Sequence, residues 1–366
     1  MQTLRKKPLS ATRARTFLVV LVAVLTIALY PFVSPGMLHN IKHLKESVHF
    51  GCFTTGGTAL LDCIEQDYIE TTNNLGAVGA MTILREDFAE YPTVTQACHQ
   101  FAHAIGRTAA RNNPSLSELF TLGDSFCWSG YYHGAIEGLL RGTKISAMDE
   151  TRVRTFCDAV APPKEAYFDY FNCVHGVGHA LMYVSNNDLP ESLARCAYYE
   201  DENDETNCAA GIFMENILSR ENGHGSDYVL RDDPFYPCRF AQSDAVRAMC
   251  HDVQATQLVI DYGYGEGAFA RCAEVAEPAL KASCYHGVGR EISAHTLYDV
   301  AQTHALCKAS GAGTAQCTLG AAKNFVAYYH GTSEAHMLCA KASESDARTC
   351  TDAVTGLGEL QTKTGE

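Results

Sequence analysis

The cysteine spacing constrains the fold of this 366-residue chain more than any other feature of its sequence. All sixteen cysteines lie after residue 51, and none forms a C-x-x-C cluster of the kind that holds metal thiolates. Their even number and regular spacing therefore predict disulfides formed in an oxidising compartment. Fourteen of them fall into pairs with similar short gaps: Cys52/Cys63, Cys157/Cys173, Cys196/Cys208, Cys238/Cys250, Cys272/Cys284, Cys307/Cys317 and Cys339/Cys350. Cys98 and Cys127 are paired only because they are left over.

The cysteine pairs also mark a repeat. From Cys173 to Cys350 the second cysteines lie 35, 42, 34, 33 and 33 residues apart, a period typical of stacked two-helix repeats. Similar residues follow them, as in CVHGVGHAL after Cys173 and CYHGVGREI after Cys284. Alternation of apolar and polar residues, the signal of strands, is scarce. The sequence therefore predicts an all-α fold of disulfide-stapled helical hairpins.

The clearest repeat predicts how one hairpin is built. Its first helix should end near Cys272, and its second should begin about Pro278, because proline is favoured in the first turn of a helix. Cys284 would then lie in the second turn, close enough for one bridge to clamp the hairpin. Since each hairpin buries its apolar face against its neighbours, we expect residues 51–366 to form one continuous solenoid, open or closed into a toroid.

In its paired helices and its single bridge per repeat, this pattern resembles the disulfide-clamped hairpin proteins related to Sel1-type repeats. The resemblance implies an all-helical repeat architecture. The glycine and alanine consensus of those repeats is not matched here, and the gap between paired cysteines is longer. No functional residue is carried over from them.

An apolar segment near the N-terminus predicts a membrane anchor. Residues 16–33 carry no charge and are long enough to cross a hydrocarbon core, while five basic residues lie within residues 1–15. Positive flanks stay in the cytoplasm, so residues 34–50 would form a juxtamembrane linker and residues 51–366 a periplasmic or extracellular domain. A cleaved signal peptide is the alternative, because the apolar run also has the length of a signal sequence core.

The charge balance excludes one class of partner. When the five basic residues before the anchor are set aside, 23 basic residues remain of the 28, against 42 acidic ones. Nucleic acid is therefore not expected as a partner, because binding to phosphate needs a basic surface.

The strongest chemical signal is a set of residue pairs spaced four apart in three consecutive repeats. This spacing places both members of a pair on one face of a helix. Imidazole and carboxylate are common ligands of zinc, iron and copper, so these positions predict a site for a divalent transition metal. The six candidate ligands are His99, His103, His133, Glu137, His175 and His179.

A structural role for the histidines is the rival interpretation, in which each imidazole bonds a neighbouring carbonyl and the adjacent glycines allow close helix packing. Histidine is absent at these positions in the repeats of Cys208 and Cys317, and this concentration in a few repeats favours a site. Three secondary candidates, His286, Arg290 and Glu291, are assigned as catalytic or substrate-binding residues on the next wall of the same groove. Glu215 is a weaker candidate ligand.

Two functions from different classes follow. The first is an exported metalloenzyme, a hydrolase with zinc or an oxidase with iron or copper, whose six ligand candidates converge on one or two ions. The second is a non-catalytic scaffold that binds protein or peptide partners on the concave face of the solenoid. The first predicts convergent histidines and the second predicts scattered ones.

Overall fold

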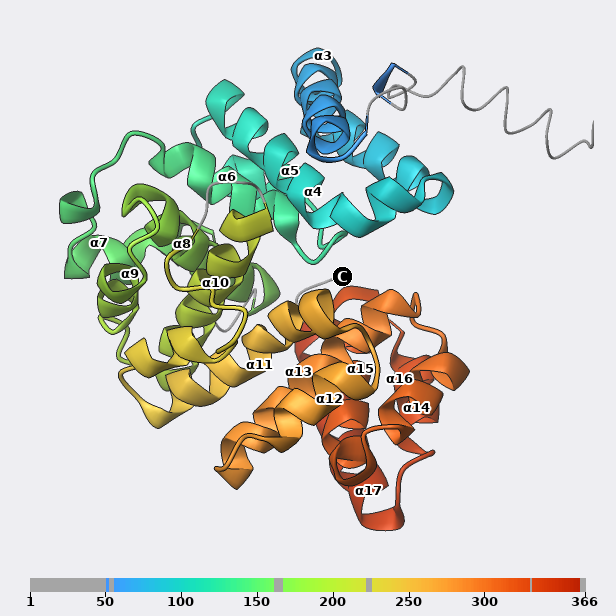
Figure 1. The fold of residues 1–366 in the computed structure, drawn as a ribbon. Coiled ribbons are helices and arrows are strands. Elements are labelled where there is room, and N and C mark those ends of the chain that lie inside the picture. Colours follow the sequence, from blue (N-terminus) through green and yellow to red (C-terminus); the bar gives the residue numbers. More distant parts are fainter. Residues whose placement is uncertain (1–50, 53–55, 161–166, 222–225, 330, 363–366) are drawn as a thin grey trace, which may run out of the picture. The chain divides into compact units, whose positions relative to one another are not determined.

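The computed structural model describes residues 51–52, 56–160, 167–221, 226–329 and 331–362. The chain divides into two compact units, Met1–Asp67 and Tyr68–Glu366. Figure 1 shows that all regular structure in these ranges is helical, which confirms the all-α prediction. Residues 16–33 of the predicted anchor lie outside the described ranges, as do the segments on either side of it. Within the described ranges, no helix has the length and apolarity needed to cross a membrane.

In the first unit, the described residues hold the bridge between Cys52 and Cys63 and the start of α3 (Thr58–Glu90). α3 runs on past Asp67, and among its residues in the second unit it is interrupted at Gly76, whose φ of 74° lies in the left-handed region that favours glycine. The predicted domain boundaries at residues 15, 33 and 50 stay predictions, because they fall in the part of the chain that is not described.

In the second unit, longer and shorter α-helices alternate, except that a 3-10 segment, Tyr236–Phe240, stands between α10 and α11. Each longer helix packs against the next longer one along the chain, and α11, α13 and α15 lie side by side in Figure 1. The longer helices are α4 (Pro92–Asn112), α6 (Gly130–Leu140), α8 (Tyr167–Val184), α10 (Glu202–Glu221), α11 (Asp244–Tyr262), α13 (Pro278–His295), α15 (Thr314–Tyr329) and α17 (Glu344–Thr362). The shorter ones are α5 (Leu116–Leu122), α7 (Glu150–Thr155), α9 (Leu189–Cys196), α12 (Glu266–Ala273), α14 (Val300–Lys308) and α16 (Thr332–Cys339).

All eight predicted cysteine pairs are disulfides, including the pair of Cys98 and Cys127. The predicted hairpin is also confirmed, because α12 ends at Ala273 and α13 begins at Pro278. A disulfide between buried cysteines joins α12 to α13. Disulfides join α14 to α15 and α16 to α17 in the same way. The continuation of these hairpins into a solenoid or a toroid stays a prediction.

Glycines bring the longer helices into backbone contact. A Cβ atom on Gly178 of α8 would overlap the carbonyl of Cys208, and one on Gly211 of α10 would overlap the carbonyl of His175. The same reciprocal arrangement holds for Gly106 with Gly134 and for Gly289 with Gly320. Close helix packing is therefore the reason for the glycines beside the histidines, and it also brings the side chains of neighbouring helices together.

This packing predicts opposite effects for two glycine substitutions. Gly178→Ala should lower the free energy of unfolding by about 1–3 kcal/mol, because the added methyl group overpacks a fixed backbone contact. Gly356→Ala in α17 should raise it by about 0.5–1 kcal/mol, because that glycine has open space around its Cα and alanine is the better helix former. Urea unfolding of both variants measures the difference, and equal effects would contradict the packing role.

Candidate metal centre

Four histidines from three neighbouring helices converge in the second unit. His99 and His103 come from α4, His133 from α6 and His179 from α8. Each offers one ring nitrogen, and these four atoms all lie within 4.8 Å of one another. Three of the rings are buried, and His99 is partly buried. The histidines therefore converge, as a site predicts, and do not scatter along the helices.

His99 is oriented by a strained turn. Its Nδ1 donates a hydrogen bond to the carbonyl oxygen of Cys127, at 2.8 Å. Cys127, Trp128 and Ser129 have φ values of 57°, 53° and 60°, which non-glycine residues seldom adopt. The disulfide from Cys127 to Cys98, the neighbour of His99, ties this turn to α4. The bridge thus fixes both the turn and the ring that it orients.

His103 is oriented by a buried ion pair. Its Nδ1 lies 2.9 Å from Oε1 of Glu137, and Nη1 of Arg107 lies 3.0 Å from the other carboxylate oxygen. Burial alone would raise the pKa of Glu137, but His103 and Arg107 together lower it to about 2. The carboxylate is therefore ionised at neutral pH, and it faces Nδ1 of His103.

His179 has a similar partner on the next helix. Its Nδ1 donates to Oε2 of Glu215 in α10, at 2.9 Å. Burial raises the pKa of Glu215 well above its usual value, and the charge of Glu137 raises it further. The two carboxylates thus differ in their ionisation, although each holds one imidazole.

These bonds leave the Nε2 atoms of three rings facing a shared centre. The Nε2 atoms of His99 and His103 lie 3.0 Å apart, within hydrogen-bond distance of each other. A cation bound between these two nitrogens would replace that hydrogen bond. Burial lowers the pKa of His99 to about 3, and it holds the pKa of His133 and of His179 well below the usual value. The rings of His99, His133 and His179 are therefore neutral, which is the form that binds a metal ion.

Glu137 and His175, the other two predicted ligands, lie outside the group of four histidines. Glu137 belongs with His103, His179 and Glu215 to a second group of potential ligands within 4.8 Å. Its contact with His103, however, has the length of a hydrogen bond, and carboxylates commonly support ligating imidazoles in this way. His175 belongs to neither group. Its ring centre lies 4.8 Å from that of His133, and burial, partly offset by Asn207, lowers its pKa to about 4.

The predicted catalytic residues form a second polar cluster between α11 and α13. Nη2 of Arg290 lies 2.9 Å from Oε1 of Glu291, and Nδ1 of His286 lies 2.5 Å from Oδ2 of Asp252. No ligand atom of His286 or Glu291 joins the histidine groups found among the described residues. The charge of Arg290 nevertheless contributes to lowering the pKa of His175.

Sequence reasoning missed three partners of these side chains. Arg107 lies four residues after His103 on the same helix, so its spacing is a signal that was available. Asp252 follows His251 in the sequence, yet it pairs with His286, which lies 34 residues away. The carbonyl of Cys127 has no sequence signal, because any residue can supply it.

A third potential group contains Cys52, Cys63 and Asp67 of the first unit. The two cysteines are joined in a disulfide and cannot act as thiolate ligands. The histidine groups are therefore the candidates for a metal.

Searches against protein-family models, curated proteins and solved structures found no match to this chain.

Proposed function

We propose that this chain is an exported metalloenzyme whose metal ion is bound by His99, His103, His133 and His179. The observation that carries the proposal is the convergence of four imidazoles, three of them with Nδ1 facing an acceptor, on one point. A purely structural role requires each imidazole to be satisfied by its neighbours. Neither ring nitrogen of His133 has a hydrogen-bond partner within the described part of the chain.

The four histidines are not equivalent. His99, His103 and His179 are each held by an acceptor at Nδ1, so their Nε2 atoms are preorganised. His133 has no such support. Catalytic zinc sites use three protein ligands and keep one position open. We assign the three supported histidines as permanent ligands and His133 as the ligand that a substrate or water can displace.

The ligand set favours hydrolysis by zinc over oxidation by iron. With Glu137 and Glu215 supporting imidazoles, no carboxylate remains for the two-histidine, one-carboxylate set typical of non-haem iron. A bound zinc ion would supply Lewis acidity and lower the pKa of a coordinated water. The chain's own contribution is to orient the imidazoles in a buried site and to keep those of His99, His133 and His179 neutral.

The location that we propose is the oxidising side of a membrane, with residues 16–33 as the anchor and the hairpins continuing as a solenoid or a toroid. The eight disulfides support an oxidising compartment, because such bridges are rare in the cytosol.

Metal retention tests the proposal directly. The full-length chain, produced in an oxidising compartment and purified without chelator, should carry about one equivalent of metal by mass spectrometry. Glu137→Gln should weaken zinc binding by about 10- to 100-fold, because the support of His103 is lost. His179→Gln should weaken it further, because a ligand is lost.

The matched control is His251→Gln. His251 is also buried on a longer helix, but its Nδ1 donates to the carbonyl of Arg247 and its ring stacks on Phe235. This variant should keep its metal. If His179→Gln keeps as much metal as His251→Gln, or if added zinc leaves the melting temperature of the metal-free chain unchanged, the histidines do not form a metal site.

A further inference from the structure

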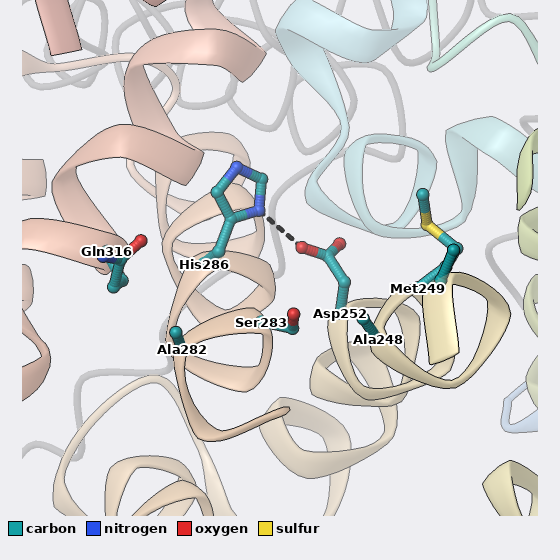
Figure 2. Close-up of a pocket in the computed structure, with 8 residues that line it drawn as sticks. Ala248, Met249, Asp252, Ala282, Ser283, His286 and Gln316 are labelled. Carbon is teal, nitrogen blue, oxygen red and sulfur yellow. Dashed lines mark hydrogen bonds and ion pairs between the residues drawn. The ribbon is translucent and has the colours of Figure 1, made fainter. Parts of the chain in front are cut away.

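His99 differs from the other supported ligands in what holds its ring. The other two face carboxylates on neighbouring helices. Figure 2 shows the same kind of support outside the metal centre, where Oδ2 of Asp252 faces Nδ1 of His286. His99 instead bonds a main-chain carbonyl, that of Cys127, and among the described residues its other hydrogen-bond partner is His103. The orientation of the His99 ring therefore depends on the conformation of the turn that contains Cys127.

This turn has an unfavourable backbone conformation. Residues 127–129 are three consecutive non-glycine residues in the left-handed region, and Cys127 is the one cysteine of the described chain with a positive φ. Such a conformation persists only where the surrounding structure enforces it. Ser129, the N-cap of α6, makes no side-chain cap, and its hydroxyl is buried without a hydrogen-bond partner among the described residues. The turn therefore lacks the side-chain bond that commonly stabilises the start of a helix.

The bridge between Cys98 and Cys127 is the covalent link between this turn and α4. Backbone hydrogen bonds within the turn, and a bond between the side chains of Trp128 and Tyr298, also restrain it. The bridge acts closest to the ligand, because Cys98 is buried and directly precedes His99. It thus holds the imidazole and the carbonyl that orients it together.

The chain between the two cysteines is a weak substitute for the bridge. Their sequence separation is 29 residues, whereas the other seven bridges have separations from 10 to 16. A longer connection leaves its ends more freedom to separate once they are no longer joined. Loss of this bridge should therefore release the turn more than loss of another bridge would release its own partners.

The rest of the metal centre has contacts of its own. The backbones of α4 and α6 meet at Gly106 and Gly134, where a Cβ atom would overlap the opposite helix. This contact lies within the helices and does not involve the turn. Release of the turn should therefore free the ring of His99 and leave His133 beside α4.

We propose that the bridge between Cys98 and Cys127 is a redox switch on the metal centre: zinc is bound tightly while this pair is oxidised, and its affinity falls when the pair is reduced, because His99 loses the acceptor that orients it. The inference rests on the proposed metal centre. Oxidation takes two electrons and two protons from the two thiols and passes them to a small-molecule or protein disulfide, which becomes two thiols. The centre is thereby completed only in an oxidising compartment.

The zinc affinity of the full-length chain in detergent, measured by competition with a chromophoric chelator, tests the switch. The double variant Cys98→Ala/Cys127→Ala should bind zinc at least about tenfold more weakly, as is typical when a ligand loses the group that orients it. The matched control is Cys272→Ala/Cys284→Ala, which removes a bridge outside the histidine group and should bind zinc as the unaltered chain does. Equal weakening in both variants, or none in either, would overturn the proposal.

A further substitution tests whether the bridge acts through His99. His99→Gln should weaken zinc binding by itself. Adding Cys98→Ala/Cys127→Ala to it should cause little further loss, because the ring that the bridge orients is already gone. A further loss as large as the one in the chain that keeps His99 would show that the bridge acts on the fold as a whole, and the switch would be wrong.

The unaltered chain provides a test that does not depend on the folding of a variant. Coupling is reciprocal, so bound zinc favours the oxidised pair by the factor by which oxidation favours zinc. In a glutathione redox buffer with a fixed concentration of free zinc, the equilibrium constant for reduction of Cys98–Cys127 should fall at least about tenfold relative to the zinc-free buffer. That of Cys272–Cys284 should not change. Alkylation and peptide mass spectrometry measure both, and a shift shared by the two pairs or by neither would refute the switch.

These measurements separate the switch from the metal centre itself. If the unaltered, fully oxidised chain binds no zinc, the proposed metal centre is wrong and the switch is wrong with it. If the unaltered chain binds zinc and the variant without the bridge binds it equally well, the metal centre stands and the switch alone is wrong.

Discussion

Full reduction of the disulfides should unfold the chain at room temperature. The bridges close loops with sequence separations from 10 to 29 residues. On the chain-entropy model each such bridge contributes roughly 3 kcal/mol to stability, and eight of them together exceed the roughly 5–15 kcal/mol by which typical domains are stable. Each hairpin is too small to stay folded by itself once its bridge is reduced.

Circular dichroism at 222 nm, before and after incubation with a phosphine reductant, measures this loss of helix. Alkylation and intact mass should confirm that all sixteen thiols are free, since the bridges are largely buried. The chain incubated without reductant is the control. Native helix content in a fully alkylated chain would show that the hairpins hold together by packing alone. Replacing Cys272 and Cys284 together by alanine should remove only about 3 kcal/mol.

The sequence predicted the local structure well because its signals are local. The cysteine spacing identified seven of the eight bridges, since both partners lie close together in the sequence, and the pair of Cys98 and Cys127 followed by elimination. Pro278 marked the start of α13 correctly because proline fixes φ in the first turn of a helix. The same signals say nothing of how one hairpin curves relative to the next, because that depends on the depth of side-chain packing between helices.

For the candidate site, the sequence predicted which side chains share a helix face, but it did not predict the distances between side chains on different helices. The spacing of His99 and His103 placed both rings on one side of α4, and the repeat placed His133 and His179 on the helices beside it. Whether Glu137 binds a metal or supports a ligand depends on its distance to His103, which arises from the packing of α4 against α6. Sequence spacing cannot supply that distance.

The glycine beside each histidine illustrates the same limit. From the sequence, Gly134 and Gly178 either made room for a substrate or allowed close packing. Their contacts with the backbones of neighbouring helices support packing. The convergence of the histidines and the helix packing are therefore coupled: the glycines bring the helices close enough for imidazoles from three of them to meet.

The metal-free chain should be acid-labile far above the pH at which carboxylates are protonated. The pKa values of His99 and His175 are lowered to about 3 and about 4, mainly by burial, and those of His133 and His179 lie well below 6.5. In the unfolded chain these imidazoles take up protons near pH 6.5. The unfolded state therefore binds more protons than the folded state below that pH, and stability falls as the pH falls from about 6.5 toward 4 and 3.

The slope of stability against pH follows from the number of buried histidines and acidic groups that titrate differently in the two states. Each of the four histidines contributes about 1.4 kcal/mol per pH unit in this window. Glu215 acts in the opposite direction, because its raised pKa lets the folded state bind a proton that the unfolded state lacks. The unfolded state therefore binds about three more protons than the folded state, which corresponds to a slope of about 4 kcal/mol per pH unit near pH 5.5. A domain of ordinary stability would then unfold near pH 5.

Urea unfolding of the chelator-treated chain at pH 7.5, 6.5, 6 and 5.5 measures this slope. Above pH 7 the four imidazoles are neutral in both states, so the stability that they supply is complete and their part of the slope vanishes. A slope that remains there comes from other groups such as Glu215. His175→Gln should reduce the slope below pH 6 by about 1.4 kcal/mol per pH unit, because one buried imidazole is gone. A stability that is flat from pH 7.5 to 5.5 would show that these imidazoles are protonated in the folded chain. The centre would then be a network of charged rings, and a metal would have to displace protons from it.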